Sequence, residues 1–331
     1  MSWNRLAAAA MLAVIAATPP LAAAPAPEIP IAPTAPRVAQ SGEAGPSLTD
    51  LVALTADRYR RLTVPVTIQG QGPFQFMIDT GAQATVITRT LADRLGLGDR
   101  QLATLVGMAS RRETEIVDIA DLQLGSRNFY IQTAPLVEAD HIGGADGILG
   151  LDSLQNQRVL FDFAAASLHV ADAEEQENNR GFDIVVKARE RLGQLIITEA
   201  MLDGVRVAVI VDTGAQNSLG NPELGRRLRR APSLGHISMT DVNGQDLVGD
   251  VRQAGELALQ SARLRNFAIM FADSPVFKAL GLNDRPTLVL GMAELQVFKR
   301  VAIDFRTRRV LFDLPSKAEQ ADPQWRSRFG H

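Results

Sequence analysis

The tripeptide Asp-Thr-Gly occurs twice in this chain of 331 residues, each time after an apolar run. Residues 76–83 read FMIDTGAQ and residues 209–216 read VIVDTGAQ, so Asp79 and Asp212 stand 133 residues apart. A carboxylate against a buried apolar run is costly unless it is paired, hydrogen-bonded or functional. A repeat kept only for its fold does not need that carboxylate in both copies. The duplication therefore makes Asp79 and Asp212 candidates for a catalytic pair.

Two such loops that meet at a pseudo-two-fold axis would bring the carboxylates about 3 Å apart. The pair would share one proton, because two like charges that close cannot both ionise cheaply. The ionised group could take a proton from a water while the protonated group polarises an amide carbonyl, which is general acid–base hydrolysis. Thr80 and Thr213 offer hydroxyls that can bond across to the other half. Gly81 and Gly214 allow a tight turn and the close approach of another chain.

A second block of sequence repeats after each of these loops. Residues 147–151 (GILGL) parallel 289–292 (VLGM), and residues 158–163 (RVLFDF) parallel 300–305 (RVAIDF). The two halves of the chain thus carry the same elements in the same order, as expected for an internal duplication.

Short β-branched runs between Gly, Pro, Asn and Asp turns predict hairpins in both halves. The clearest runs are residues 64–68, 74–78, 195–197 and 205–211. Two segments, residues 91–95 and 222–228, are expected to form short helices. We predict an all-β protein with two pseudo-symmetric lobes, each of about 120–130 residues.

The chain divides into six expected segments. Arg5, an apolar stretch over residues 6–18 and small residues up to Ala23 are typical of a secretory signal peptide. The segments are a signal peptide (1–23), an Ala/Pro-rich tether (24–49), a first lobe (50–172), an acidic linker (173–182), a second lobe (183–315) and a polar tail (316–331). We expect a periplasmic or secreted protein, with an uncleaved membrane anchor as the alternative.

Composition narrows the chemistry further. Lys plus Arg number 34 and Asp plus Glu number 37, a balance that gives no support to a nucleic-acid partner. The chain has no cysteine, and its four histidines lack the spacing of metal ligands. We therefore expect no metal and no cofactor.

The repeated pattern resembles that of aspartic proteases of the retropepsin type, in their bacterial, exported, two-lobed form. The motif continues as Ala-x-x-Ser/Thr to Thr85 and Ser218, and a later apolar-apolar-Gly ends at Gly150 and Gly291. The resemblance covers roughly residues 55–172 and 183–315. It implies a closed, barrel-like sheet in each lobe, a substrate cleft between the lobes and flap hairpins over that cleft.

The resemblance also implies the roles of single residues. Asp79 and Asp212 would be the catalytic pair, braced by Thr80 and Thr213. The residues that would bind the substrate backbone are Gly81, Ala82, Gln83, Gly214, Ala215 and Gln216. Flap candidates are the turn with Gly107 and Met108 and the turn with Asn243 and Gly244, where Asn-Gly is a strong hairpin signal; ordinary surface hairpins are the alternative.

Two positions in each repeat depart from related enzymes. Gln83 and Gln216 stand where viral members carry an acidic residue, and Ala82 and Ala215 stand where pepsin-like enzymes usually carry Ser or Thr. Without a hydroxyl that favours the charged carboxylate, the pKa values of the pair should rise. We expect a weakly acidic working pH.

Two functions remain open at this point. The first is an aspartic endopeptidase that cleaves extended polypeptides, and the second is a catalytically inactive peptide-binding scaffold that kept the fold. Two matched halves on a short linker favour pairing within one chain, because the linker keeps their effective concentration high. We expect a monomer that acts as an intramolecular pseudo-dimer, with a polypeptide substrate as its partner.

Overall fold

The computed structural model describes residues 14–16, 50–53, 55–56, 62–155, 157–172, 179 and 181–316. Most of the expected signal peptide, the tether, most of the acidic linker and the tail beyond Ser316 lie outside these residues. Among the described residues, no helix has the length and apolar character needed to span a membrane.

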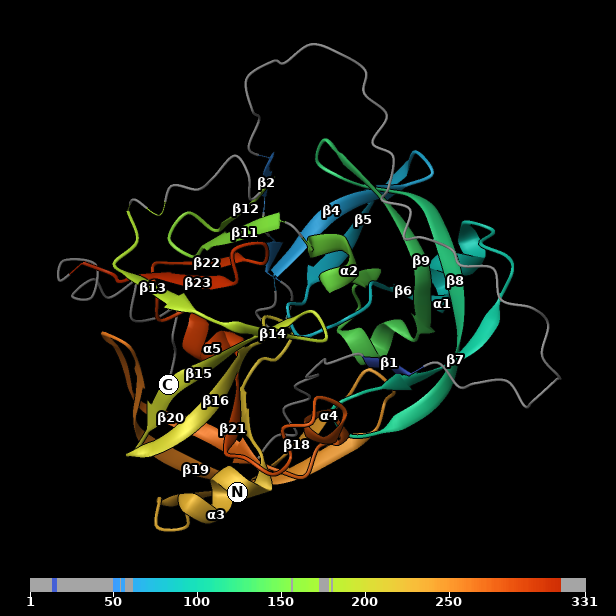
Figure 1. Ribbon diagram of the computed structural model, residues 1–331. Helices are drawn as coiled ribbons and strands as arrows, with labels where there is room; N and C mark the ends of the chain where they lie inside the picture. The colour runs from blue at the N-terminus through green and yellow to red at the C-terminus, as the bar shows by residue number, and fades with distance from the viewer. Residues whose placement is uncertain are drawn as a thin grey trace, which may run out of the picture.

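The first lobe is a nine-stranded sheet in which six strands close into a ring (Figure 1). Its strands are β1 (Val14–Ala16), β3 (Thr55–Ala56), β4 (Leu62–Ile68), β5 (Gln71–Ile78), β6 (Val86–Thr88), β7 (Gln101–Val106), β8 (Arg111–Leu124), β9 (Arg127–Val137) and β10 (Gly147–Leu149). The order is β1-β7-β8-β9-β6-β10-β5-β4-β3, and a further pairing of β8 with β4 closes the ring. Three short helices accompany it: α1 (Arg89–Arg94), η1 (Ala139–Ile142) and α2 (Leu151–Leu154).

The second lobe repeats this plan with eight strands. They are β14 (Arg189–Arg191), β15 (Gln194–Leu202), β16 (Val205–Val211), β17 (Ser218–Gly220), β18 (Ser233–Thr240), β19 (Asp246–Leu259), β20 (Ala262–Phe271) and β21 (Thr287–Leu290). The order is β14-β15-β16-β21-β17-β20-β19-β18, and the pairing of β15 with β19 again closes six strands into a ring. Its helices are α3 (Pro222–Arg227), α4 (Pro275–Ala279) and α5 (Met292–Leu295). The prediction of an all-β fold with two similar lobes is confirmed.

A third sheet joins the lobes, and the sequence analysis did not predict it. Its strands are β2 (Asp50–Ala53), β11 (Gln157–Asp162), β12 (Ser167–Asp172), β13 (Ile184–Lys187), β22 (Arg300–Asp304) and β23 (Arg309–Asp313), in the order β13-β23-β22-β11-β12-β2. At its centre the repeated segments β11 and β22 pair with each other in antiparallel register, with Phe161 opposite Val301. The repeat thus supplies the strands that connect the halves.

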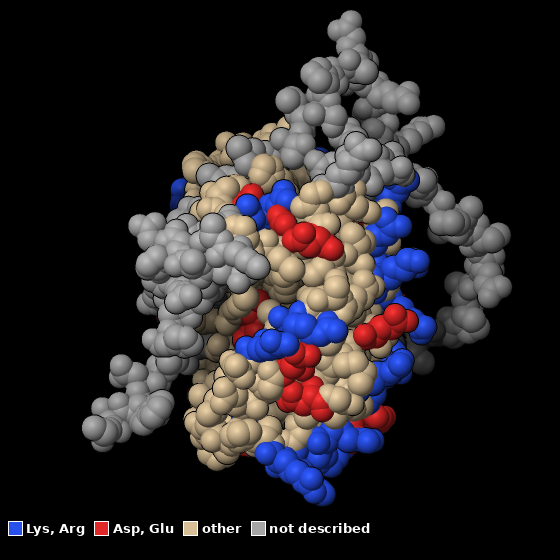
Figure 2. Space-filling model, turned by 90° about the vertical axis from the view of Figure 1, so that its left-hand side faces the viewer, with Lys and Arg blue, Asp and Glu red and all other residues tan. Residues whose placement is uncertain are grey.

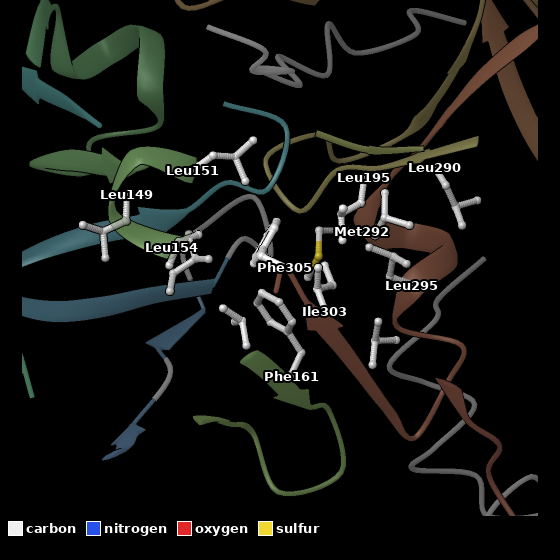
Figure 3. Close-up of a cluster of buried hydrophobic side chains, with 14 of the residues drawn as sticks. Leu149, Leu151, Leu154, Phe161, Leu195, Leu290, Met292, Leu295, Ile303 and Phe305 are labelled. Atoms are coloured by element: carbon white, nitrogen blue, oxygen red, sulfur yellow. The ribbon is translucent and has the colours of Figure 1, made fainter. Parts of the chain in front are cut away.

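One apolar core runs through both lobes and the joining sheet. Figure 3 shows Phe161, Ile303 and Phe305 between leucines of the first lobe and Met292 and Leu295 of the second. Phe161, Ile303 and Leu295 are almost completely buried. Burial of apolar surface on this scale stabilises the two lobes as one unit.

Both predicted helices exist, with shifted ends. The first is α1, which begins at Arg89 because the Thr88 side chain accepts a hydrogen bond from the Leu91 amide and caps the helix. The second is α3, which begins at Pro222 after the cap residue Asn221. A capping side chain and a proline at the first helical position are typical helix starts.

Charged side chains lie mainly on the surface. The face in Figure 2 carries acidic and basic residues among larger uncharged areas, with several Lys and Arg along one edge. The described residues include six buried charged side chains, which are Asp79, Arg158, Asp212, Asp241, Glu294 and Asp304. Because burying a charge is costly without compensation, each of them needs a structural or functional reason.

Candidate active site

Two strand ends place the carboxylates of Asp79 and Asp212. Strand β5 ends at Ile78 and pairs in parallel with β10, and the Asp79 amide donates to the Leu149 carbonyl (3.0 Å). In the second lobe β16 pairs in parallel with β21, and the Asp212 amide donates to the Leu290 carbonyl (3.0 Å). The same backbone geometry therefore positions both aspartates.

The glycines after Leu149 and Leu290 allow this arrangement. A Cβ on Gly150 would lie 2.5 Å from the Ala84 carbonyl oxygen, and a Cβ on Gly291 would lie 2.7 Å from the carbonyl carbon of Asn217. Any side chain there would push the loop after each aspartate away. The repeated apolar-apolar-Gly motif thus reflects close packing behind the two loops.

The two carboxyl groups lie close together where the two loops meet, and both aspartates are 0% exposed. Asp79 Oδ1 accepts from the amides of Gly81 (2.7 Å) and Ala82 (2.9 Å). Asp212 Oδ1 accepts from Gly214 (2.9 Å) and Ala215 (3.1 Å). The Oδ2 atom of each aspartate is buried and has no hydrogen-bond partner among the described residues.

Gly81 and Gly214 each lie against the aspartate of the other lobe. A Cβ on Gly81 would lie 2.5 Å from Asp212 Oδ2, and a Cβ on Gly214 would overlap the Asp79 carboxyl group. Glycine is therefore required at both positions for the carboxylates to approach each other. The sequence analysis expected a close approach at these glycines, and the structure shows that the opposite carboxylate makes it.

Burial raises the pKa of both aspartates. The pKa of Asp212 rises to about 6 through burial, although the neighbouring Asp79 side chain and the amides of Ala215 and Gly214 lower it. The pKa of Asp79 is raised well above its usual range by burial first and by the charge of Asp212 second. The pair therefore holds a proton at weakly acidic pH. Burial is the main cause of the shift, whereas the sequence analysis had attributed the raised pKa values to the like charges of the pair and to the missing hydroxyls at Ala82 and Ala215.

Thr80 and Thr213 bond across to the opposite loop. The Thr80 hydroxyl donates to the Val211 carbonyl (2.9 Å) and accepts from the Thr213 amide (3.1 Å). The Thr213 hydroxyl donates to the Ile78 carbonyl (2.8 Å) and accepts from the Thr80 amide (3.1 Å). These four crossed bonds hold the two aspartates at a fixed separation.

A hydroxyl–acid pair lies behind each loop, and the sequence analysis missed both acids. In the first lobe the Thr85 hydroxyl donates to Asp152 (2.6 Å) and accepts from the Gly150 amide (3.2 Å). In the second lobe Ser218 donates to Glu294 and accepts from the Gly291 amide (3.1 Å). The signal was present in the sequence, because an acid follows each apolar-apolar-Gly by two or three residues.

Glutamine side chains link the lobes beside the pair. Gln83, expected to bind substrate backbone, donates to the Leu192 carbonyl (2.7 Å) in the turn before β15. Gln194, which the sequence analysis did not single out, is buried and donates to the Gly81 carbonyl. For Gln216, which was also expected to bind substrate backbone, the structure shows a bond within the second lobe, where its backbone carbonyl accepts from the Ala293 amide (3.0 Å).

The flap candidates occupy two hairpin turns. Gly107 and Met108 lie in the turn between β7 and β8 (residues 107–110, the first turn), and Asn243 and Gly244 lie in the turn between β18 and β19 (residues 241–245, the second turn). The structure brings the two turns into direct contact, since Asn243 Nδ2 donates to the Ser110 hydroxyl (3.0 Å).

The described residues contain no cluster of three or more histidine or acidic side chains able to hold a metal ion. The two carboxyl groups of Asp79 and Asp212 can exchange protons with a molecule held between them.

Comparison with known proteins agrees with this geometry. A family model described as aspartyl protease matches residues 64–153 and 198–293, which together make up more than half of the chain. The first matched segment contains Asp79 and the second contains Asp212. A search of curated proteins gives no match. The chain belongs to the aspartyl protease family.

Proposed function

We propose that the protein is an aspartic endopeptidase that hydrolyses peptide bonds of extended polypeptides, with Asp79 and Asp212 as its catalytic pair. One observation carries this proposal. Two buried carboxyl groups face each other with one oxygen each held by backbone amides and the other oxygen without a partner. A shared proton satisfies such a pair while leaving one acidic and one basic oxygen.

The reaction follows from this arrangement. The ionised carboxylate takes a proton from a water as the water oxygen attacks the amide carbon, and the protonated carboxyl donates its proton to the carbonyl oxygen. The C–N bond of the resulting diol then breaks. The leaving nitrogen receives the proton taken from water, and the other carboxylate recovers its own proton from a hydroxyl group. Each step is general acid or general base catalysis.

Other residues of the site support this reaction. Thr80 and Thr213 fix the distance between the acid and the base, and Gly81 and Gly214 let them approach. We assign the backbone of Gly81–Gln83 and Gly214–Gln216 to the binding of an extended substrate. The N-terminal sequence supports action outside the cytoplasm.

The test is cleavage of a fluorogenic peptide library by wild type, Asp79→Asn and Asp212→Asn. Each variant removes the shared proton site, so we expect a loss of about 10²–10⁴-fold in cleavage rate. Asp99→Asn changes an exposed aspartate and serves as the matched control. Fluorescence anisotropy with a labelled library peptide reports whether binding survives.

Two results would contradict the proposal. Peptide binding without cleavage by the wild type would favour the inactive scaffold. Maximal cleavage well below pH 3 would contradict a pair whose pKa values are raised.

A further inference from the structure

A hollow on the second lobe is lined by three arginines that come from three separate elements. It encloses about 520 Å³, and none of the described residues that line it belongs to the loops of the carboxyl pair. Arg206 lies on β16, Arg227 ends α3, and Arg285 lies in the loop before β21. Figure 1 shows α3 at the outer end of the second lobe, next to β16 and β21. We call this space the arginine hollow.

Hydrogen bonds fix the backbone around the arginine hollow. The Asn221 side chain caps α3 by accepting from the Leu224 amide (2.9 Å), and it also donates to the Arg285 carbonyl (2.7 Å). The Ala208 amide of β16 donates to the Pro286 carbonyl (2.9 Å). The backbone positions of the three arginines are therefore set relative to one another, while their charged ends stay at the surface.

Two of the three positive charges are not compensated. Among the described residues, Arg206 and Arg285 are exposed and have no ion pair or side-chain hydrogen bond. Arg227 donates through Nε to Glu223 (3.0 Å), which leaves the other N–H groups of its guanidinium available. No acidic residue lines the hollow, and Asp284, the chain neighbour of Arg285, is not part of its wall.

The first lobe does not carry the two uncompensated arginines. Counted from the repeated aspartates, Pro73 stands at the position of Arg206. Counted from the repeated apolar-apolar-Gly motif, Gly144 stands at the position of Arg285. Because the first lobe forms the same strands without these charges, the fold does not need them, and a ligand gives them a reason.

The wall of the hollow differs between the lobes as well. In the first lobe the buried ring of Phe74 lies under Arg94, whose guanidinium carbon is 5.4 Å from the ring centroid. In the second lobe Val207 takes the place of that ring beside Arg227 and lines the hollow. The smaller side chain leaves the space that the ring fills in the first lobe.

We propose that the arginine hollow binds the phosphate group of a phosphate monoester. The planar donors of arginine match the oxygens of phosphate. A phosphate monoester carries about −1.5 to −2 charges at pH 7, which balances the two uncompensated arginines, whereas a carboxylate carries only one. A small phosphorylated molecule and the terminal phosphate of a lipid share this chemistry. The site is separate from the proposed peptide hydrolysis.

The first test is calorimetric titration of the protein with glycerophosphate at low salt. We expect binding by the wild type and a loss of at least about tenfold in affinity for the double variant Arg206→Gln/Arg285→Gln, because both charge-assisted contacts are removed. Both side chains are exposed, so the variant should fold, and circular dichroism checks this. Arg189→Gln changes an exposed arginine of β14 outside the hollow and should bind like the wild type.

A second variant tests the space without touching a charge. Val207→Phe copies the first lobe and should fill the hollow, so glycerophosphate binding should fall at least about tenfold although all three arginines remain. Val207→Ile adds much less volume and is the matched control. Wild-type affinity in a folded Val207→Phe protein would show that the hollow is not the site.

The charge of the ligand gives a third test. The second pKa of a phosphate monoester is about 6, whereas arginine stays charged at all working pH values. The pKa of Glu223 is held below its usual range by Arg226 and Arg227, so this group stays charged as well. Affinity should therefore fall several-fold between about pH 7.5 and about pH 5. Equal affinity at both pH values would contradict recognition of a doubly charged phosphate.

Vesicles distinguish the two sources of the phosphate. Sedimentation with phosphatidylcholine vesicles that contain phosphatidic acid, lost in the double variant and absent with phosphatidylcholine alone, assigns the site to a lipid. Binding of glycerophosphate without sedimentation assigns it to a soluble molecule. The proposal fails if the wild type binds neither probe, if the double variant binds as well as the wild type, or if acetate binds as tightly as glycerophosphate.

The outcome is independent of the proposed peptidase activity. Peptide cleavage should be the same in the wild type and in Arg206→Gln/Arg285→Gln, because neither arginine belongs to the catalytic site. A protein that cleaves no peptide can still bind glycerophosphate, so each proposal can fail alone.

Discussion

The two lobes match closely where they meet at the carboxyl pair and differ where their hairpin turns meet. At the pair, the Thr80 and Thr213 hydroxyls donate over 2.9 and 2.8 Å, and both accept over 3.1 Å. Where the turns meet, the Ala109 amide and the Ser110 hydroxyl of the first turn donate to Asp241, and the second turn supplies this buried carboxylate.

The difference has a physical reason. Identical groups placed around a two-fold axis face their own kind, which suits two carboxyl groups that share one proton. The same symmetry at the turns would set donor against donor or carboxylate against carboxylate. A duplicated chain escapes this constraint because each copy can change separately. The structure indicates that the turns have diverged into complementary partners while the pair has stayed symmetric.

The strongest test of the symmetric part is the pair of variants Thr80→Val and Thr213→Val. Each leaves one buried carbonyl and one buried amide without a partner, at about 1–3 kcal/mol per group. We expect both variants to lose about 2–6 kcal/mol of unfolding free energy in urea titrations, and to lose equal amounts. Thr80→Ser and Thr213→Ser keep the hydroxyl and should stay close to wild type. Clearly unequal losses would show that the crossed bonds are not equivalent.

A smaller effect should distinguish the two acids behind the loops, Glu294 and Asp152, through the pH dependence of stability. Burial raises the pKa of Glu294 from 4.5 to about 7. Because its folded-state pKa lies above the unfolded value, the wild type loses stability as pH rises from about 4.5 through 7. Glutamine cannot ionise, so the Glu294→Gln variant does not lose this stability. Its unfolding free energy relative to that of the wild type should rise by up to about 3 kcal/mol as pH increases from 4.5 to 8.

The matched variant in the first lobe is Asp152→Asn. Partial burial of its carboxyl group against Thr85 raises the pKa of Asp152 as well, although the hydrogen bonds from Thr85 lower it. The residue as a whole is exposed, so we expect a smaller change in the same direction. The carboxyl pair of Asp79 and Asp212 titrates in the wild type and in each variant alike. Its contribution to the pH dependence of stability therefore cancels when the variant is compared with the wild type. Unfolding free energies measured from pH 4.5 to pH 8 check the prediction, and a difference that does not depend on pH would refute it.

The smallest expected effect compares the two helix caps. Thr88 accepts one hydrogen bond, from the Leu91 amide, so Thr88→Ala should cost about 1 kcal/mol. Asn221 accepts from the Leu224 and Thr287 amides and also donates to the Arg285 carbonyl (2.7 Å), so Asn221→Ala should cost more. Thermal unfolding of both variants measures the difference. Equal losses would mean that the additional bonds of Asn221 contribute nothing.

The sequence allowed the symmetric part of the site to be predicted because its signal was local and doubled. Asp79, Thr80 and Gly81 recur as Asp212, Thr213 and Gly214, and each residue type has a reason to stand at the end of a buried strand. The crossed threonine bonds and the close approach at the glycines follow from that duplication.

The features that the sequence did not reveal depend on partners distant in the chain. Strand β11 pairs with β22 across the pseudo-two-fold axis, and nothing in either segment specifies that the partner is its own repeat. The role of Asp241 depends on a turn that lies 132 residues away in the chain. Gln194 is an ordinary polar residue until folding places it on the Gly81 carbonyl. Such contacts become visible only when the register of every strand is known.

The crossed threonine bonds also bear on when the protein can first act. Val211 supplies the carbonyl that holds Thr80, and Ile78 supplies the one that holds Thr213, so neither loop is complete until both halves have emerged and folded. A growing polypeptide with only its first half made contains Asp79 but not Asp212, so the carboxyl pair cannot form. If cleavage needs both, the molecule is harmless to its neighbours throughout its own synthesis.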